Sequence, residues 1–428
     1  MKLKTLIALV AIAAAFNWQA EAQTYDTNGV VVQTFAGSGF SGYVDGVGQQ
    51  TMFNNPISIV ADSAGNLFAV DSGNHRIRKI APDGIVTTLV GGGGGSLPGY
   101  GTNLCLNCGF SSPPWNGFGS LAIDRSNVLW IPVYVGSGIT WLLRIDTNTY
   151  VSGVMTNENN TIGLSSASGI CADSGNNIFY SDSGGNRIYR RSTNGTVTVF
   201  AGSGNGGYAD GKGIFTAFNA PRALAADPAD NIYVWDSSNF LIRRIDQSQN
   251  VTTFAGRYVN GSSSDGVGTN AGFNSVSQMF FDNSGNLILA CNNCIRRISA
   301  ATNVTTIAGS FSQTGYTNGT GTLARFDGAS GVCISGGTIY VADSSNQRIR
   351  SINFNPSMQP VLPANLQLNT YSGLQIVGTV GRTYQVQSSP DMTNWTTRAT
   401  LLLTSSPYLW IDQNPVSGNK FYRALLLP

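Results

Sequence analysis

A six-residue phrase recurs along most of the chain at a nearly constant spacing. Residues 32–37 read Val-Gln-Thr-Phe-Ala-Gly, and close copies end at Gly202, Gly256 and Gly309. These last three glycines are 54 and 53 residues apart, and Gly37 lies about three such periods before Gly202. A period of this length marks a repeat architecture, in which each copy is one supersecondary unit that buries its apolar face against its neighbours.

Each period carries four short apolar or alternating segments, separated by Asp, Asn, Gly and Ser. In the first copy they cover 57–60, 67–70, 76–80 and 85–90. Strands of about five residues between regular turn signals predict an all-β fold, and four strands per period are typical of a propeller blade. Six copies of the innermost strand predict six blades. Because the last copy stops before a fourth strand, we expect the N-terminal strand at 31–35 to complete that blade and close the ring.

The best-preserved copy has a recognisable signature. Residues 71–80 read Asp-Ser-Gly-Asn-His-Arg-Ile-Arg-Lys-Ile, and Asp45-Gly46 and Phe53-Asn54 precede them. This pattern resembles the NHL repeat, and the resemblance covers about 30–355. It implies a six-bladed propeller that acts as a binding or interaction module in exported bacterial proteins, although some relatives are enzymes or RNA binders.

The N-terminus has the features of an export signal. Lys2 and Lys4 precede an apolar run over 5–16 that is too short to anchor in a bilayer, and Ala20-Glu21-Ala22 offers a small-x-small cleavage site. We therefore predict a signal peptide over 1–22, an exported protein that begins at Gln23, and no membrane span. The alternatives are an uncleaved anchor and a buried N-terminal helix.

The repeat ends near residue 355, and the composition then changes. Residues 356–363 contain three prolines and are predicted to be a linker, and several alternating strands follow over 364–428. We expect a small β-sandwich of immunoglobulin or fibronectin type there. The segment 384–395 is similar to a C-terminal β module of exported verrucomicrobial proteins. It would serve in surface attachment, in saccharide contact or as a stabilising cap.

The balance of titratable residues restricts the chemistry. The formal net charge is +2 with 11% charged residues, so the basic excess typical of nucleic-acid binding is missing. Downstream of the predicted signal, His75 is the one histidine and Glu158 the one glutamate. The lyases that resemble this fold need several histidines on zinc, and the lactonases need a channel glutamate. We predict a protein without catalytic residues, metal or cofactor. The alternative is a metal-dependent hydrolase or lyase in the central channel.

Aspartates and arginines also recur once per blade. Asp residues follow the second strand and precede Gly in the connections between blades, and Arg residues recur on the third strand. Calcium would need six or more oxygens at one point, so we interpret the aspartates as turn residues and expect the arginines to pair with acids or line the ring. The aspartates are Asp71, Asp182, Asp236, Asp343, Asp45, Asp210 and Asp265, and the arginines are Arg78, Arg190, Arg243, Arg297 and Arg350.

Six cysteines in an exported chain permit disulfides. Cys291 and Cys294 flank a tight Asn-Asn turn, and Cys105 and Cys108 lie in a glycine-rich insertion, so each pair is a candidate disulfide. A shared zinc site would require the two pairs to meet across the ring. Redox catalysis would require a helix N-terminus or a nearby cation, and the sequence shows neither. Cys171 and Cys333 are expected to be buried.

The loops between blades are the predicted recognition surface, because loops on a rigid scaffold carry binding. We expect the side chains that depart from the repeat there to contact a protein or glycan ligand, on a monomer. Tyr43, Tyr208 and Tyr316 recur in register and are interpreted as packing residues. The candidate ligand-binding residues are Arg222, Gln278, Trp115, Arg257 and Tyr258.

Overall fold

The chain forms two compact units, Met1–Asn355 and Pro356–Pro428, in the computed structural model. The predicted signal peptide and linker lie outside the described residues. Among those residues, no helix has the length and apolar composition needed to cross a membrane. The structure describes residues 29–91, 120–134, 140–147, 152–157, 167–354, 365–368, 373–377, 379, 381–389, 393–403, 408–411 and 421–427.

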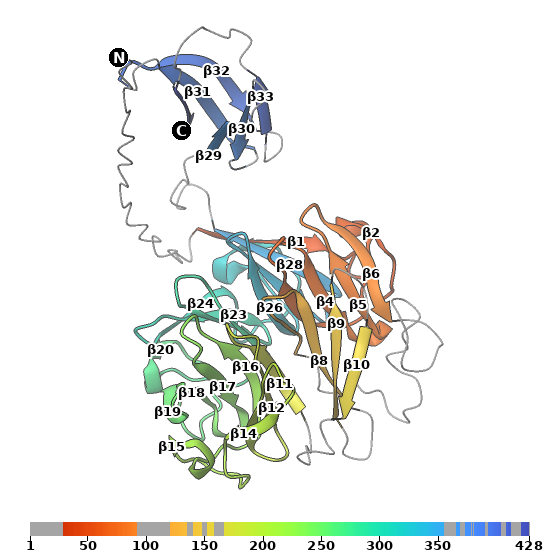
Figure 1. Cartoon of the computed structure of the whole chain (residues 1–428), viewed down its shortest axis with the longest axis vertical. Coiled ribbons are helices and arrows are strands. Elements are labelled where there is room, and N and C mark those ends of the chain that lie inside the picture. The colour runs from red at the N-terminus through yellow and green to blue at the C-terminus, as the bar shows by residue number, and fades with distance from the viewer. Residues whose placement is uncertain are drawn as a thin grey trace, which may run out of the picture. The chain divides into compact units, whose positions relative to one another are not determined.

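The first unit is a propeller of antiparallel sheets that lie side by side around a common centre (Figure 1). We number its six sheets as blades in chain order and list the strands of each from the centre outward. Blade 1 is β3 (Pro56–Ala61), β4 (Leu67–Asp71), β5 (Arg76–Ile80), β6 (Ile85–Gly91) and β2 (Gly46–Val47); blade 2 is β7 (Ala122–Ile123), β8 (Val128–Tyr134), β9 (Thr140–Asp146) and β10 (Ser152–Asn157); blade 3 is β11 (Ala167–Ala172), β12 (Ile178–Asp182), β13 (Arg187–Arg191) and β14 (Val197–Ala201).

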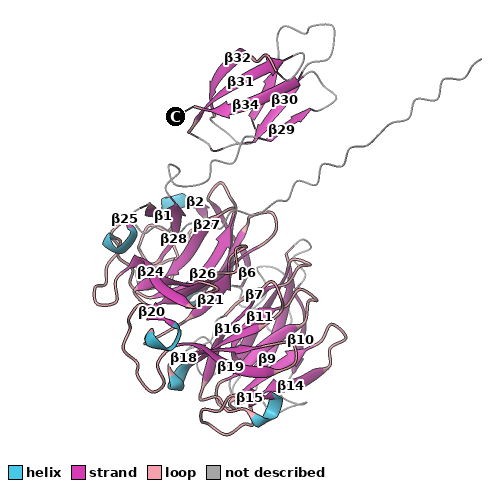
Figure 2. Cartoon of the chain, turned by 90° about the vertical axis from the view of Figure 1, so that its left-hand side faces the viewer, coloured by secondary structure: helices cyan, strands magenta, loops and turns pink. Residues whose placement is uncertain are grey.

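The other blades repeat the plan, and the all-β prediction is confirmed. The described connections contain only short helical turns, which Figure 2 shows between long stretches of strand and loop. Blade 4 is β16 (Pro221–Ala226), β17 (Ile232–Asp236), β18 (Leu241–Ile245), β19 (Asn250–Ala255) and β15 (Gly211–Lys212); blade 5 is β21 (Gln278–Phe281), β22 (Leu287–Cys291), β23 (Cys294–Ile298), β24 (Asn303–Gly309) and β20 (Gly266–Val267); blade 6 is β26 (Ala329–Ser335), β27 (Thr338–Asp343), β28 (Arg348–Phe354), β1 (Val30–Ala36) and β25 (Gly319–Thr320).

The N-terminal strand lies in the last blade. β1 pairs with β28 from Val30 opposite Phe354 to Ala36 opposite Ile349. Each innermost strand also contacts the next one around the centre, and β26 contacts β3. Apolar side chains fill the space between neighbouring sheets, as where Val60 of blade 1 packs with Leu129 of blade 2. Burial between blades, rather than within any one sheet, therefore holds the ring together.

The recurring glycine marks a point where the backbone passes very close to the neighbouring strand. Gly37 has a φ of +98° and Gly202 a φ of +101°, a region that other residues rarely adopt. A Cβ on Gly37 would lie 2.5 Å from the carbonyl oxygen of Gln347, and one on Gly202 would lie 2.5 Å from that of Asn186. The phrase that revealed the repeat thus ends in glycine for both conformational and steric reasons.

A buried arginine organises blades 1, 4, 5 and 6. In blade 1, Arg78 of β5 donates to Asp71 at 2.9 Å and to Asp45 at 2.6 Å, and its guanidinium lies 5.0 Å from the centroid of the Phe53 ring. Asp71 also accepts the backbone N–H of Asn54 at 2.7 Å. The expected pairing of arginines with acids is present in these blades. The arginines of the other three blades are Arg243, Arg296 and Arg350.

Two of the predicted arginine positions were shifted by one residue. Blade 3 has Tyr189, not Arg190, at the buried position, and blade 5 has Arg296, not Arg297. Pairing with the second strand sets this register: Arg296 lies opposite Leu289 and Tyr189 lies opposite Tyr180, as Arg78 lies opposite Ala69 in blade 1. Side chains alternate between the two faces of a strand, so a shift of one residue exchanges a buried position for a more exposed one.

The second unit consists of two three-stranded sheets. Ile376 from one sheet packs with Tyr384 and Val386 from the other, so the two sheets share one small apolar core. The Tyr384 hydroxyl accepts the backbone N–H of Thr379 at 2.8 Å. The sheets are β29 (Asn365–Leu368), β30 (Gly373–Val377) and β33 (Tyr408–Ile411), and β32 (Thr396–Leu402), β31 (Thr383–Ser389) and β34 (Phe421–Leu426).

The buried pair of blade 6 predicts a pH-dependent loss of stability in Arg350→Met. Burial raises the pKa of the Asp343 carboxyl, and the charge of Arg350 and a hydrogen bond from Asn346 oppose that rise. Without Arg350 the folded-state pKa rises further, so the folded protein binds more protons than the unfolded chain and loses stability as the pH rises from 4 to 7. We expect the propeller to lose about 3–5 kcal/mol at pH 7 and less at pH 4, measured by urea denaturation.

The double variant Asp343→Leu with Arg350→Met is the control, because it leaves no unpaired buried charge. We expect it to recover most of the lost stability at pH 7. Equal losses for the single variant at both pH values would contradict the role given to this pair.

Candidate functional site

The centre of the propeller holds an apolar cavity of about 110 Å³. Innermost strands of blades 1 to 5 contribute to its wall. Within that lining, Gln278 is the one side chain with a hydrogen-bonding amide. The other members include Val60, Leu121, Ile170, Leu224, Met279 and Phe280.

The Gln278 side chain extends from blade 5 to the inner strands of blades 1 and 6. Its Oε1 accepts hydrogen bonds from the hydroxyl of Ser58 at 3.1 Å and from the backbone N–H groups of Ile59 and Val332 at 3.2 Å each. Its Nε2 donates to the Ile59 carbonyl at 3.1 Å. The Ser58 hydroxyl also accepts the N–H of Leu121 at 2.9 Å. A side chain of blade 5 thus ties together the inner strands of blades 1 and 6.

Small residues take the place of Gln278 in the other blades. The equivalent positions are occupied by Ser58, Ser120, Gly169, Ala223 and Gly331, and at the two glycines the backbone leaves no room for a side chain. A Cβ on Gly331 would lie 2.9 Å from the Cα of Ser58. We call Gln278 the brace of the channel, because its amide bonds to the inner strands of two other blades. Its contact with a ligand stays a prediction.

Arg222 lies at the start of β16, one residue before the position that matches Gln278, and it is exposed. Its backbone carbonyl accepts the Ser181 hydroxyl at 2.7 Å, which fixes the strand end that carries it. The predicted contact of Arg222 with a ligand stays a prediction.

Arg257 and Tyr258 lie in the connection from blade 4 to blade 5. Arg257 donates to the Asn270 carbonyl at 2.7 Å within the same connection. The Tyr258 ring packs on Tyr208, with centroids 4.7 Å apart, and the Tyr208 hydroxyl lies 3.0 Å from Thr253 Oγ1. The structure thus brings Tyr258 against a residue from the preceding connection.

The recurring tyrosines are more exposed than packing residues would be. Tyr43 is 61% exposed and Tyr316 is 64% exposed, and each ring lies over an arginine that directly follows a turn between second and third strands. Those arginines are Arg76, at 4.1 Å from the ring centroid, and Arg348, at 5.0 Å. The prediction that these tyrosines are packing residues was therefore wrong. Their position in polar, glycine-rich loops indicated that they would be exposed.

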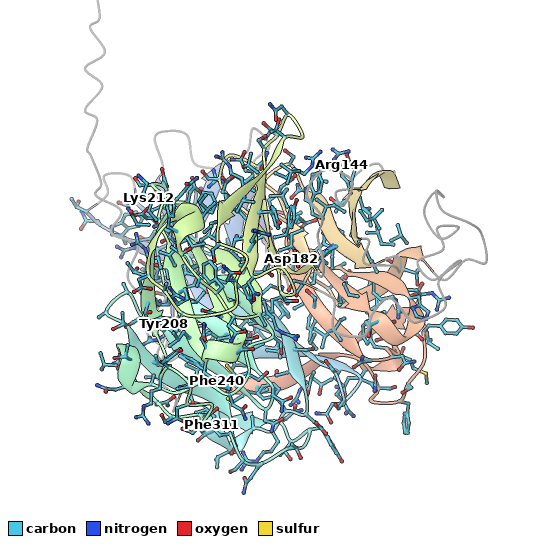
Figure 3. All side chains as sticks on the ribbon, turned by 90° about the horizontal axis from the view of Figure 1, so that it is seen from below. Arg144, Asp182, Tyr208, Lys212, Phe240 and Phe311 are labelled. Atoms are coloured by element: carbon cyan, nitrogen blue, oxygen red, sulfur yellow. The ribbon has the colours of Figure 1, made fainter. Side chains whose placement is uncertain are left out.

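Exposed apolar side chains concentrate in the connections between blades. Among the described residues of the propeller, every large exposed hydrophobic side chain lies in one of them, except Ile85 and two valines of the short outer strands β2 and β20, Val47 and Val267. Figure 3 shows Tyr208, Phe240 and Phe311 along one side of the ring. We name Tyr43, Tyr208, Tyr258, Phe311 and Tyr316 the aromatic surface.

The cysteines differ from expectation at one of the two predicted pairs. Cys291 and Cys294 are free thiols in the structure, so the disulfide predicted between them is absent from it. Cys171 and Cys333 are buried, as expected, and burial raises the pKa of both thiols. Cys105, Cys108 and Trp115 lie outside the described residues.

No three His, Cys, Asp or Glu side chains gather closely enough to hold a metal ion in the part of the chain that the structure describes. His75 ends a helical turn of the blade 1 hairpin with a φ of +52°, a place that Phe240 takes in blade 4 with a φ of +60°. This shared conformation gives His75 a turn position rather than a place at the channel.

The brace predicts a specific loss of stability in Gln278→Leu. A leucine keeps the volume but leaves the N–H groups of Ile59 and Val332 without their buried acceptor, so we expect a loss of about 2–3 kcal/mol in urea denaturation. Arg222→Ala is the matched control, because it truncates an exposed side chain next to the position that matches Gln278. It should change the free energy of unfolding by no more than about 0.5 kcal/mol. A Gln278→Leu protein as stable as the control would show that the amide does not hold the channel.

Known proteins share this repeat. The family model described as "NHL repeat" matches residues 53–80 and 326–350, in blades 1 and 6. NHL repeat-containing protein 2 of Homo sapiens is 25% identical over 371 residues, which cover 78% of this chain and 43% of the relative. The same protein of Gallus gallus is 37% identical over 94 residues, 22% of this chain and 13% of the relative. The chain thus spans less than half the length of these curated relatives.

Solved structures share the fold over three quarters of the chain. A Bacteroides thetaiotaomicron protein described as of unknown function has a TM-score of 0.59 at 18% identity, with 76% of each chain covered. An auxiliary nutrient binding protein of the same organism has a TM-score of 0.56 at 17% identity, again with 76% of each chain covered. These identities carry the fold alone, and they agree with the repeat found in the sequence. The first unit of this chain is a β-propeller in which segments of blades 1 and 6 match the NHL repeat.

Proposed function

We propose that this protein is an exported, non-catalytic binding propeller that takes a protein or glycan ligand on its aromatic surface. The observation that carries the proposal is the distribution of exposed apolar side chains, which gather in the connections between blades. Isolated exposed hydrophobic residues are ordinary on a protein surface, but repeated aromatic side chains on a rigid scaffold are typical of recognition sites.

The aromatic surface has a defined geometry that supports binding. Tyr43 and Tyr316 lie over arginine guanidinium groups, and Tyr208 packs between Tyr258 and the buried Arg243, which lies 4.9 Å from its ring centroid. Cation–π contacts of this kind hold a ring in place while its other face stays open. Fixed aromatic rings lose little conformational entropy on binding, and they suit flat sugar faces as well as apolar peptide side chains.

A metal-dependent hydrolase or lyase in the channel is the competing function. Such a site would need a cluster of charged ligands facing the cavity, together with an open coordination position. The described lining of the cavity is apolar apart from Gln278, whose amide is bonded to the inner strands. This lining supports binding at the periphery over chemistry at the centre.

Binding is tested by probing the full chain, without its signal, on oligosaccharide and peptide arrays. For the ligands found, we expect Tyr43→Ala, Tyr258→Ala or Tyr316→Ala to weaken affinity about tenfold, because aromatic anchors dominate interface energies. The matched control is Ile85→Ala, which truncates an exposed hydrophobic residue outside the connections and should leave affinity unchanged. An array without bound probes, or ligands held equally well by all three variants, would refute the proposed surface.

Export makes a separate prediction about the mature chain. When the full chain is produced with a secretion pathway present, we expect the recovered protein to begin at Gln23, with intact mass as the readout. Replacing both Lys2 and Lys4 with Glu should retain the protein inside the cell at its full mass. Wild-type protein recovered inside the cell with residues 1–22 still attached would contradict export.

A further inference from the structure

Blade 5 breaks the arginine pattern at one position. In blades 1, 4 and 6 the buried arginine pairs with a buried aspartate at the end of the second strand, at 2.9, 2.9 and 2.7 Å. Cys291 occupies that place at the end of β22. Arg296 keeps Asp265 at 2.9 Å as the outer acid of its blade, but a thiol stands where the buried carboxylate would be.

The surroundings of Arg296 keep its charge close to the thiol. The side chain is 1% exposed, and its guanidinium lies 4.6 Å from the ring centroid of Phe273 and 5.1 Å from that of Phe311. The sequence had suggested that no cation lies near the Cys291–Cys294 pair, and the fold shows that one does. A buried guanidinium next to a cysteine favours its thiolate, as it favours the carboxylate in the other blades.

The second thiol lies directly opposite the first. Cys291 and Cys294 are cross-strand partners in a hairpin whose turn contains only Asn292 and Asn293, with a φ of +54° at Asn292. Facing residues in such a ladder have Cα atoms about 4.5–5.5 Å apart, a span that a disulfide bridges without rearranging the backbone.

The two thiols are not equivalent. Cys291 is partly exposed, whereas Cys294 is buried and its Sγ lies 3.7 Å from the Cys291 carbonyl oxygen. A hydrogen bond from the Cys294 thiol and the charge of Arg296 lower the pKa of Cys291, against the opposing effects of burial and Asp265. Donating that hydrogen bond, together with burial, raises the pKa of Cys294. The more acidic thiol belongs to the more exposed of the two residues, which is the arrangement of an attacking and a resolving cysteine.

We propose that Cys291 and Cys294 form a peroxide-reactive dithiol, in which Cys291 is the attacking thiolate held by Arg296 and Cys294 is the resolving thiol. The motivating observation is the replacement of the repeat's aspartate by a cysteine that lies opposite a second thiol and on the same face of the sheet as a buried arginine. The proposal does not depend on which ligand the aromatic surface binds.

The reaction takes place in two steps. The Cys291 thiolate attacks one oxygen of hydrogen peroxide, the O–O bond breaks, and the departing hydroxide takes up a proton to become water, leaving a sulfenic acid. Cys294 then gives up its proton and attacks the Cys291 sulfur. An S–S bond forms, the S–O bond breaks, and hydroxide leaves as a second water. Two thiols are oxidised and one peroxide is reduced to two waters.

Alkylation of the reduced full-length protein tests the first step. After a short iodoacetamide pulse at a series of pH values, trypsin releases residues 258–296, a peptide whose only cysteines are Cys291 and Cys294. We expect Cys291 to be labelled with a midpoint below the pKa of about 8.5 of an ordinary cysteine. In Cys294→Ala, which lacks the hydrogen-bond donor to Cys291, the midpoint of Cys291 labelling should move to a higher pH. A wild-type midpoint at or above the ordinary value would overturn the proposal.

Peroxide treatment tests the second step. With equimolar peroxide, the wild-type peptide should lose the mass of two hydrogen atoms and regain it after treatment with dithiothreitol. Cys294→Ala should instead accumulate a sulfenic acid that dimedone traps on Cys291. Both thiols remaining reduced, or a purified protein that already holds this disulfide and resists glutathione, would refute a reactive pair.

Cys291→Asp separates reactivity from folding. This variant restores the aspartate–arginine pair of the other blades, so we expect a thermal midpoint at or above that of the wild type and no peroxide-dependent change in the peptide. If the variant is less stable than the wild type, Cys291 does not stand in for the aspartate, and the proposal fails.

Discussion

A buried guanidinium is the interaction on which four of the blades depend, and in blades 1 and 4 it lies between an inner carboxylate and an outer one. In blade 1, Arg78 reaches Asp71 at the end of the second strand and Asp45 in the connection from the previous blade. Asp45 also accepts the backbone N–H of Thr88 in β6, the fourth strand of the same blade, at 3.1 Å. Through these two aspartates, Arg78 joins the hairpin of the second and third strands to the connection from the previous blade and to the fourth strand. These charge-assisted hydrogen bonds hold the polar connection in one conformation.

The centre of the ring is held by a different device. Small residues occupy the position of Gln278 in the other five blades, and the long amide of Gln278 bonds to the inner strands of blades 6 and 1. The Gln278 amide in the channel is thus hydrogen-bonded within the protein and stabilises the ring. Recognition is left to the connections, where Tyr43 and Tyr316 are fixed by arginines and open to solvent.

Departures from the repeat have unequal meanings. Gln278, Arg222 and Cys291 each break the pattern, yet one braces the channel, one is exposed beside it, and one replaces a carboxylate. Conversely, the repeated tyrosines looked structural and are largely exposed. A repeated residue has the same local contacts in each blade. For the tyrosines, the contact with an arginine holds the ring at the surface.

The sequence by itself determined the repeat, the all-β class, the strand positions and the second unit, because a two-residue alternation and glycine-containing turns are local properties. Only the tertiary structure decided that Gln278 bonds to Ile59, which lies 219 residues away, and that Arg296 rather than Arg297 is buried. It likewise placed Arg296 beside Cys291. Closing the ring joins residues that are far apart along the chain, and a shift of one residue in strand pairing moves a side chain to the other face of the sheet. Partners across blades therefore follow from packing and not from local pattern.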